Sequence, residues 1–314
     1  MKLKKIYQLF GWTLLLGSCQ STVILNTGNT TPLLVLNSIL EGDCDSLRVQ
    51  LSLTQPINDT NVFTWITDAG IQIFENGEKI ADAEPDASGW YVAFHKVKPN
   101  ATYRIEAETA EYGKVWGETH VPDVISNGRL DIDSIEAHKG RYKISYSWTD
   151  HPEERNFYWL GMMNSKQNSI RMYLTYLYTD SPLPDPFNRF FDDSFRIPYG
   201  YEHYIRIDDL GLSGKELHLI AYDYSGNYGN MRKAFLLSVD SNYDAYIKST
   251  LININNNFIT DDIFLFYEPA YTHSNIHGGV GLVASCTHIE KILITPEPYE
   301  EPYPVLTDIA NNRP

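Results

Sequence analysis

The chain has 314 residues, of which 43% are hydrophobic, 21% charged and 13% aromatic, and this composition excludes a disordered protein, a collagen-like repeat and a coiled coil. The 40 acidic and 25 basic residues give a formal net charge of −15, so a surface for nucleic acid or anionic lipid, which needs positive faces, gets little support. The three cysteines exclude a small fold held by disulfides, and the length suffices for about two domains.

Residues 1–18 have the pattern of a secretory signal peptide. Three lysines precede a mostly apolar stretch from Ile6 to Leu16, which is shorter than the ~20 residues that a membrane-spanning helix needs. The stretch ends in Leu16-Gly17-Ser18-Cys19, which matches the bacterial lipobox, in which the cysteine thiol is lipidated and becomes the first residue of the mature chain. No later run of 18 apolar residues occurs, so we expect the lipid on Cys19 to be the only membrane anchor.

Short strands follow a flexible tether. Residues 19–32 are predicted as the tether because Ser21 to Thr31 is rich in Ser, Thr, Asn and Gly. From residue 33 onward apolar and polar residues alternate, and Asn76-Gly77 supplies hairpin-turn chemistry. About seven short strands over residues 33–122 predict an immunoglobulin-like β-sandwich, without the Cys–Trp–Cys pattern of antibody domains.

Residues 123–295 are predicted to form a second, sandwich-like β-rich domain. One segment near the C-terminus instead has apolar residues at helical spacing: Leu236, Leu237, Val239, Tyr243, Tyr246, Ile247 and Leu251. With Asp240 or Ser241 as the N-cap, this pattern predicts a helix at about 241–252. Residues 296–314 are rich in proline and are expected to be an extended or disordered tail. The predicted class is therefore all-β with one short helix.

Glu268-Pro269 and then a distinctive stretch come after the predicted helix. Before them stand the leader and the two β-rich parts. The motif residues of the stretch are Ser274, Asn275, Ile276, Gly278, Gly279 and Gly281. This layout resembles the domain-of-unknown-function family 4249 of Bacteroidota envelope lipoproteins, which carries Ser-Asn-Ile-x-Gly-Gly-hydrophobic-Gly before its last strand. The resemblance covers essentially the whole mature chain.

The resemblance implies an outer-membrane location and a TonB-dependent receptor as partner. No catalytic residues are established for the family, so none is carried over. Surface-exported lipoproteins of that phylum often have acidic residues after the lipidated cysteine, whereas Gln20 to Ile24 contain none. Whether the body faces the cell surface or the periplasm therefore stays open.

The glycines of the motif admit two interpretations. Gly278, Gly279 and Gly281 either form a structural bulge that turns the chain into its final strand, or form a binding loop. A phosphate loop is not expected, because neither Lys-Ser nor Lys-Thr follows. His273 and His277 lie four residues apart, but the asparagine and glycines beside them argue against the helix that a metal site of this spacing needs. No metal site is predicted.

Acidic clusters also lack a catalytic pattern. The segment from Asp223 to Asn230 faintly resembles a calcium loop but has no terminal Glu, so a polar turn is predicted. Asp192-Asp193 and Asp208-Asp209 are acid pairs of a kind that any acidic protein offers by chance. No Gly-x-Ser-x-Gly elbow is present. We therefore expect no enzymatic activity and no cofactor.

Two further features leave alternatives open. Cys44 and Cys286 remain after Cys19 is lipidated, and they either form a disulfide between the two predicted domains or are free buried thiols. The segment from Tyr178 to Tyr204 is read as an aromatic loop that either packs or forms a contact surface. The candidate contact residues are Phe187, Phe190, Phe191, Tyr199 and Tyr201.

The sequence thus favours a non-catalytic, lipid-anchored accessory or binding subunit of a TonB-dependent transporter, with no nucleic-acid partner. The second hypothesis is a free-standing glycan-binding or adhesion lipoprotein. The third is an envelope hydrolase, which is the weakest because no nucleophile–base or metal arrangement is visible.

Overall fold

The computed structural model describes residues 31–55, 65–136, 141–152, 155–165, 172–175, 177–184, 204–223, 229–259 and 271–295. The chain separates into one unit of residues 1–32 and 55–61, of which only Thr31, Pro32 and Gln55 are described, and a second unit that contains all elements below. The signal peptide, the lipobox, the aromatic loop residues 187–201 and the Pro-rich tail lie outside the described residues.

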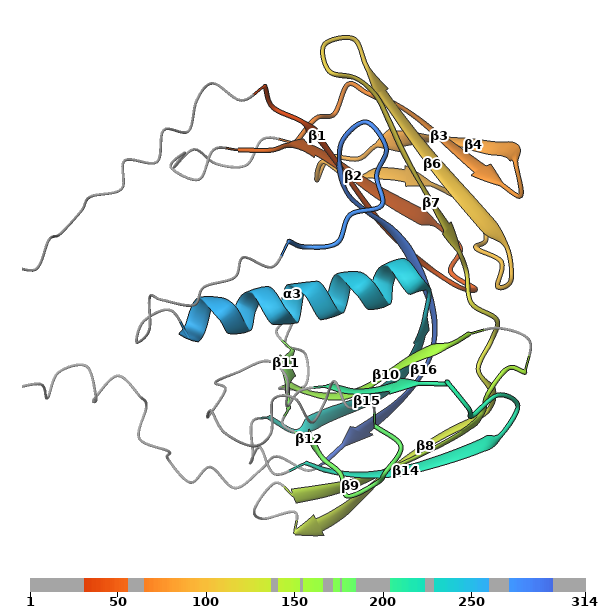
Figure 1. Ribbon diagram of the computed structural model, residues 1–314, viewed down its shortest axis with the longest axis vertical. Helices are drawn as coiled ribbons and strands as arrows, with labels where there is room; N and C mark the ends of the chain where they lie inside the picture. The colour runs from red at the N-terminus through yellow and green to blue at the C-terminus, as the bar shows by residue number, and fades with distance from the viewer. Residues whose placement is uncertain are drawn as a thin grey trace, which may run out of the picture. The chain divides into compact units, whose positions relative to one another are not determined.

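In the first half, the part of the chain that the structure describes forms seven strands, the number that the turn pattern predicts. They are β1 (Leu34–Glu41), β2 (Leu47–Leu53), β3 (Gly70–Glu75), β4 (Glu78–Pro85), β5 (Tyr91–Ala93), β6 (Thr102–Thr109) and β7 (Gly113–His120). In β2, Leu47, Val49 and Leu51 are buried while Arg48 is exposed, so the period-two pattern sets which face enters the core. Figure 1 shows these strands as an immunoglobulin-like sandwich, with β1 and β2 facing β3, β6 and β7 across the core.

The described residues of the second half form nine strands. They are β8 (Ser126–Glu136), β9 (Arg141–Thr149), β10 (Phe157–Ser165), β11 (Tyr173–Leu174), β12 (Leu177–Tyr178), β13 (Tyr204–Asp208), β14 (Glu216–Asp223), β15 (Met231–Val239) and β16 (Val280–Ile294). Strands β12, β14, β9 and β8 form a four-stranded sheet in that order. Its apolar face packs against β10, β13 and β15 of the larger sheet. The all-β, sandwich-like class with one helix is confirmed.

The helix α3 (Ser241–Ile259) is the one helix of the described residues and begins where the sequence places it. Asp240 is the N-cap, since its Oδ1 accepts a hydrogen bond from the backbone N–H of Tyr243 at 2.9 Å. Tyr243, Ile247 and Leu251 face the larger sheet on the side away from the four-stranded sheet (Figure 1). No helix in this part of the chain has the length and apolarity to cross a membrane.

Three apolar residues of the predicted helical pattern are not helical. Leu236, Leu237 and Val239 lie on strand β15, not on an approach to the helix. This strand has the four-stranded sheet on one face and α3 on the other, so both faces are apolar. A strand buried on both faces gives a continuous apolar run, which helical spacing also fits.

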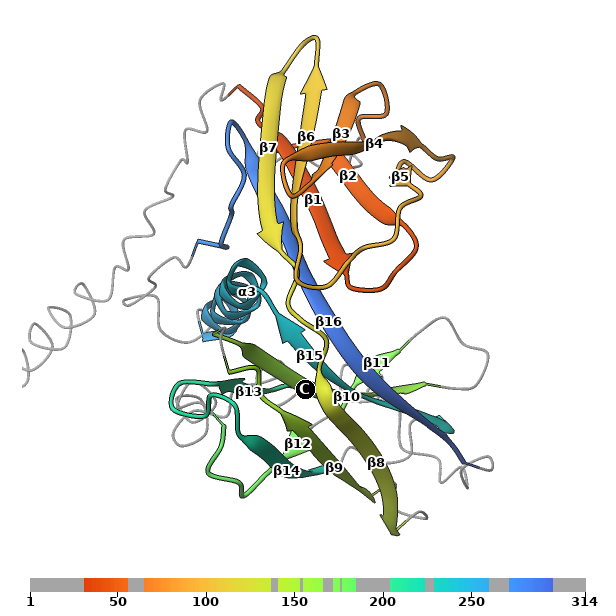
Figure 2. The same cartoon turned by 90° about the vertical axis from the view of Figure 1, so that its right-hand side faces the viewer.

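Strand β16 joins the two halves. Its residues Val280–Cys286 pair in parallel with β1, and Cys286–Ile294 pair antiparallel with β15. Figure 2 shows this long strand following β1 first and β15 afterwards. The last strand therefore completes the N-terminal sandwich as well as the C-terminal one, and the large sheet runs in the order β11-β10-β15-β16-β1-β2-β5-β4-β3-β6-β7. The division at residue 122 stays a prediction.

Candidate functional site

A pocket in the described part of the chain has a volume of about 580 Å³. It lies where the end of β7, the start of β10 and the first turn of α3 meet. Its polar lining includes Glu118 and His120 from β7, Arg155 and Asn156 before β10, and Ser241 at the start of α3. This volume is in the usual range of small-molecule sites. The sequence marks none of these five as a site residue, and Ser241 appears there only as a possible N-cap.

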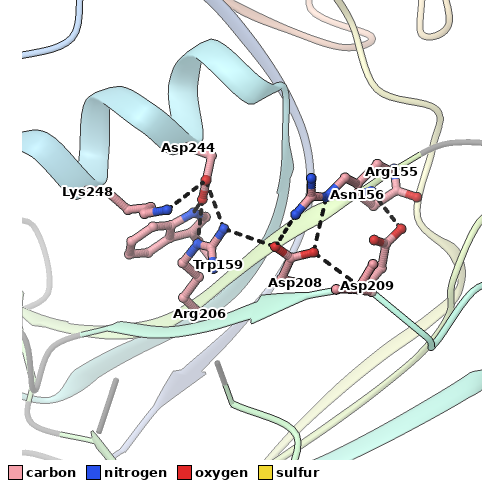
Figure 3. Close-up of polar contacts among 9 residues, drawn as sticks. Arg155, Asn156, Trp159, Arg206, Asp208, Asp209, Asp244 and Lys248 are labelled. Carbon is pink, nitrogen blue, oxygen red and sulfur yellow. Dashed lines mark hydrogen bonds and ion pairs between the residues drawn. The ribbon is translucent and has the colours of Figure 1, made fainter. Parts of the chain in front are cut away.

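One wall of the pocket depends on how α3 is held on the sheet. Arg206 of β13 and Asp244 of α3 form a two-point ion pair, with 2.6 Å between Nε and Oδ1 and 2.9 Å between Nη2 and Oδ2 (Figure 3). Trp159 Nε1 donates to the same Oδ1 at 2.9 Å, and Lys248 Nζ lies 3.9 Å from Oδ2. Arg206 and Asp244 are almost completely buried. Helix α3 is thus fixed over β10 and β13.

The acid pair Asp208-Asp209 lies beside this ion pair, but its two carboxylates do not face each other as a pair of catalytic acids would. Asp208 accepts two hydrogen bonds from Arg155, and Asp209 accepts one from the backbone N–H of Asn156 at 2.7 Å (Figure 3). Burial raises the pKa of Asp209, whereas the Arg155 contacts outweigh burial and lower the pKa of Asp208. Both residues position the segment that enters β10.

A chain of oxygens links α3, β7 and β16 at the pocket wall. Asp240 Oδ2 lies 2.8 Å from Thr119 Oγ1, which lies 2.7 Å from Ser285 Oγ, and Ser285 Oγ donates to the carbonyl of His120 at 2.9 Å. Thr119 Oγ1 donates to Asp240, and the Ser285 N–H donates to the other carboxylate oxygen at 3.3 Å. Burial raises the pKa of this carboxyl, although these hydrogen bonds act to lower it.

The family-motif residues before β16 make structural contacts. Asn275 Nδ2 donates to the carbonyls of Glu118 at 3.0 Å and Val283 at 2.7 Å, and its Oδ1 accepts from the Val283 N–H at 2.9 Å. Ser274 Oγ accepts from the Gly281 N–H at 3.1 Å. Ile276 enters the core of the N-terminal sandwich. These contacts tie β7 to β16.

The motif glycines lie against backbone. A Cβ at Gly279 would meet the carbonyl oxygen of Leu34 at 2.4 Å, and one at Gly281 would meet that of Leu36 at 2.2 Å. Gly278 has φ +81°, and a Cβ there would lie 2.7 Å from the carbonyl oxygen of Lys114. Only glycine permits this close approach. The contacts give the three glycines a structural role.

The two histidines of the motif region contact different partners. His273 Nε2 lies 3.1 Å from Asn242 Oδ1, whereas the His277 ring stacks on Trp116 with centroids 3.9 Å apart. Arg104 also lies over the Trp116 ring. In the described part of the chain, no group of three or more His, Cys, Asp and Glu side chains is placed to hold a metal ion.

Several other sequence candidates are placed only in part. Cys44 is partly exposed and Cys286 is buried, and both are free thiols. They lie near one another, since Glu41 pairs with Cys286 across β1 and β16 and its carbonyl accepts from the Cys44 N–H. Asp223, expected in a polar turn, ends β14 and is fully buried. Cys19, the contact-loop residues and Asp192-Asp193 lie outside the described residues.

Solved structures resemble the chain only distantly. A collagen adhesin of S. aureus matches with a TM-score of 0.24 and 9% identity, over 84% of this chain and 96% of that one. A protein of Corynebacterium diphtheriae described as membrane anchored matches with a TM-score of 0.22 and 11% identity, over 67% of this chain and 55% of its own length. The chain thus spans about half of the latter protein. Scores this low carry no functional argument.

No curated protein matches the sequence. The model of one family, described as "Domain of unknown function (DUF4249)", matches residues 21–292. The matched span contains every strand of the two sandwiches except the last two residues of β16, together with α3, the pocket and the Ser-Asn-Ile-x-Gly-Gly motif. The chain belongs to the domain-of-unknown-function family DUF4249.

Proposed function

We propose that this chain is a lipid-anchored outer-membrane lipoprotein of Bacteroidota that acts as a non-catalytic accessory or binding subunit of a TonB-dependent transporter. The observation that carries the proposal is the basic and apolar leader that ends in Leu16-Gly17-Ser18-Cys19. A lipid on Cys19 would hold a body whose first strand begins at Leu34, so residues 19–32 separate the anchor from the sandwich.

Two of the buried acids are occupied by structural contacts, which fits a non-catalytic role. Asp244 is engaged by Arg206 and Trp159. Burial would raise the pKa of Glu75, but hydrogen bonds from Lys98, His95 and Tyr103 outweigh it and lower the pKa to about 2. A carboxyl group with a pKa this low is ionised near neutral pH and binds protons weakly, so it is a poor general acid or base there. These acids stabilise the fold.

Fractionation of cells tests the anchor. Wild-type protein is expected in the membrane pellet after a carbonate wash, and Cys19→Ala is expected in the soluble fraction. Cys44→Ala is the matched control, because it removes a thiol outside the lipobox and is expected to stay with the membrane. If Cys19→Ala still pellets with the outer membrane, the lipobox interpretation is wrong.

The partner hypothesis has a separate test. A transporter accessory is expected to co-purify with a large β-barrel in stoichiometric amount. A free-standing binder is expected to be isolated alone and to bind polysaccharide without a barrel. These outcomes separate the two hypotheses even when the anchor is confirmed.

A further inference from the structure

The core of the N-terminal sandwich contains two side chains from near the end of the chain. Ile276 of the motif and Val283 of β16 lie in one buried cluster with the inward-facing residues of β1 to β7. Gly117 in β7 leaves the space that they fill, since a Cβ there would meet Ile276 Cδ1 at 2.6 Å and Val283 Cβ at 2.9 Å. The first sandwich is therefore shaped to receive a segment that comes last in the sequence.

The backbone of this sandwich depends on the same segment. Strand β1 lies between β2 and β16, and its residues 35–41 pair with Val280–Cys286 at a sequence separation of 245 positions. The side chain of Asn37 adds to this pairing, because its Oδ1 accepts from the Leu282 N–H at 3.1 Å. Without β16, one side of β1 would lose its backbone partners, and buried backbone groups are rarely left unpaired.

Strand β7 is held by the residues that lead into β16. The backbones of Trp116 and His277 exchange two hydrogen bonds, at 2.8 Å and 3.1 Å, and Thr119 Oγ1 lies 2.7 Å from Ser285 Oγ. We call residues 274–286 the strap, since they contact both β1 and β7. The strap thus supplies core, backbone pairing and side-chain contacts to a sandwich whose other strands all come before residue 121.

The second sandwich uses the same strand. Beyond the strap, Cys286–Ile294 pair with β15, and Ile289 and Leu293 pack against the second core. Figure 2 shows β16 continuing without interruption from one sandwich into the other. Both sandwiches belong to one compact unit of the chain. A strand that is part of both cores cannot leave one of them without disturbing the other.

We propose that the strap makes folding of the N-terminal sandwich conditional on the end of the chain, so that the two sandwiches fold and unfold as one cooperative unit. N-terminal domains usually fold first, while synthesis proceeds at about 5–20 residues per second. Here the first half waits for the strap, which would keep it unfolded during the export that the leader indicates. The proposal concerns folding alone, so its failure leaves the tests of the anchor and of the barrel partner unchanged.

Hydrogen exchange of the full-length protein, read by mass spectrometry, tests the proposal. Peptides from β2 and β6 report on one sandwich, and peptides from β9 and β10 report on the other. In urea, all four are expected to lose protection at one common midpoint. In refolding, pulse labelling is expected to find β2 and β6 protected no earlier than β16, because pairings this distant in sequence form slowly. Earlier protection of β2 and β6, or survival of one sandwich in urea that unfolds the other, would overturn the proposal.

Three isoleucines give a matched set of variants. Ile276 lies in the first core and Ile144 in the second. Ile276→Ala and Ile144→Ala are each expected to lower the urea midpoint of both sandwiches by about 1 M, and by the same amount in each. Ile220 is 40% exposed on β14, so Ile220→Ala is expected to shift both midpoints much less. A loss confined to the sandwich that carries the substitution would show independent folding and contradict the proposal.

Discussion

Arg206 and Asp244 meet in a buried two-point ion pair that fastens α3 to the sheet, although 38 positions separate them in the sequence. Trp159 completes the arrangement by donating to the same carboxylate. Since α3 begins at Ser241, directly after its N-cap Asp240, and both residues line the pocket, this ion pair positions one wall of the candidate binding site.

Asp244→Ala is expected to lower the free energy of unfolding by ~3 kcal/mol, because it removes the two-point partner of the buried Arg206, whose contact with Asp208 is longer at 3.6 Å. The measurement is urea unfolding followed by tryptophan fluorescence. Asp82→Ala is the control, since its ion pair with Lys79 is mostly exposed and is worth at most ~1 kcal/mol. Replacing both partners, as Arg206→Met with Asp244→Leu, is expected to recover part of the loss. Equal losses for Asp244→Ala and Asp82→Ala would contradict the role given to the pair.

Asp240→Asn is expected to preserve stability at pH 7 or to raise it. Its amide keeps a partner for the Thr119 hydroxyl without a buried charge, and asparagine is an equally good N-cap. Asp240→Ala loses both contacts and is expected to cost ~1–2 kcal/mol.

The pH dependence checks the same account. Burial raises the folded-state pKa of Asp240 above its ordinary value of 3.8, so the folded state holds the proton more tightly than the unfolded chain. The contribution of Asp240 to stability is full below that value and falls as the pH rises through the folded pKa. As the pH rises from 3.8 through the folded-state pKa of Asp240, the Asp240→Asn variant should therefore gain stability relative to the wild type. An unchanging difference would show that Asp240 is not protonated preferentially in the folded state.

Gly279→Ala is expected to destabilise the protein strongly and Gly279→Val to prevent folding, because any Cβ there meets the carbonyl oxygen of Leu34 at 2.4 Å. Gly70→Ala is the matched control in β3, where a Cβ has no neighbour within 4 Å. There the substitution is expected to be neutral or to add ~0.4–1 kcal/mol. A normal melting temperature for Gly279→Val would rule out the structural role of the motif.

Thiol labelling separates the two remaining cysteines. Burial raises the pKa of the Cys286 thiol to about 12, so its reactive thiolate is scarce at pH 8, whereas Cys44 is partly exposed. Iodoacetamide is expected to modify Cys44 in the folded protein and to modify Cys286 only after denaturation, as read by peptide mass spectrometry. If neither residue reacts until a reductant is added to the denatured protein, the two form a disulfide.

The sequence predicts the elements whose pattern is local. The strict alternation of Tyr142, Ile144, Tyr146 and Trp148 marks β9 because that strand has one buried face, and Asp240 marks the start of α3 because capping involves neighbouring residues. It cannot show that β16 changes partner from β1 to β15 at Cys286, since both partners are distant in the sequence.

The candidate pocket was missed for the same reason. Its residues come from four segments, and none carries a motif. The neighbouring ion pair has no local signal either. Arg206 and Asp208 alternate with Ile205 and Ile207 in β13, so the pattern alone places the two charged side chains on a solvent-facing side of the strand. The partner, Asp244, could not be identified without the fold.

The central claim is tested most directly by affinity capture of the tagged, lipidated protein from detergent-solubilised outer membranes, with Cys19→Ala captured in parallel. Quantitative mass spectrometry is expected to find one TonB-dependent β-barrel in stoichiometric amount with the wild type and far less with Cys19→Ala, which has lost its place in the membrane. Wild-type protein recovered from the membrane without such a barrel would contradict the account.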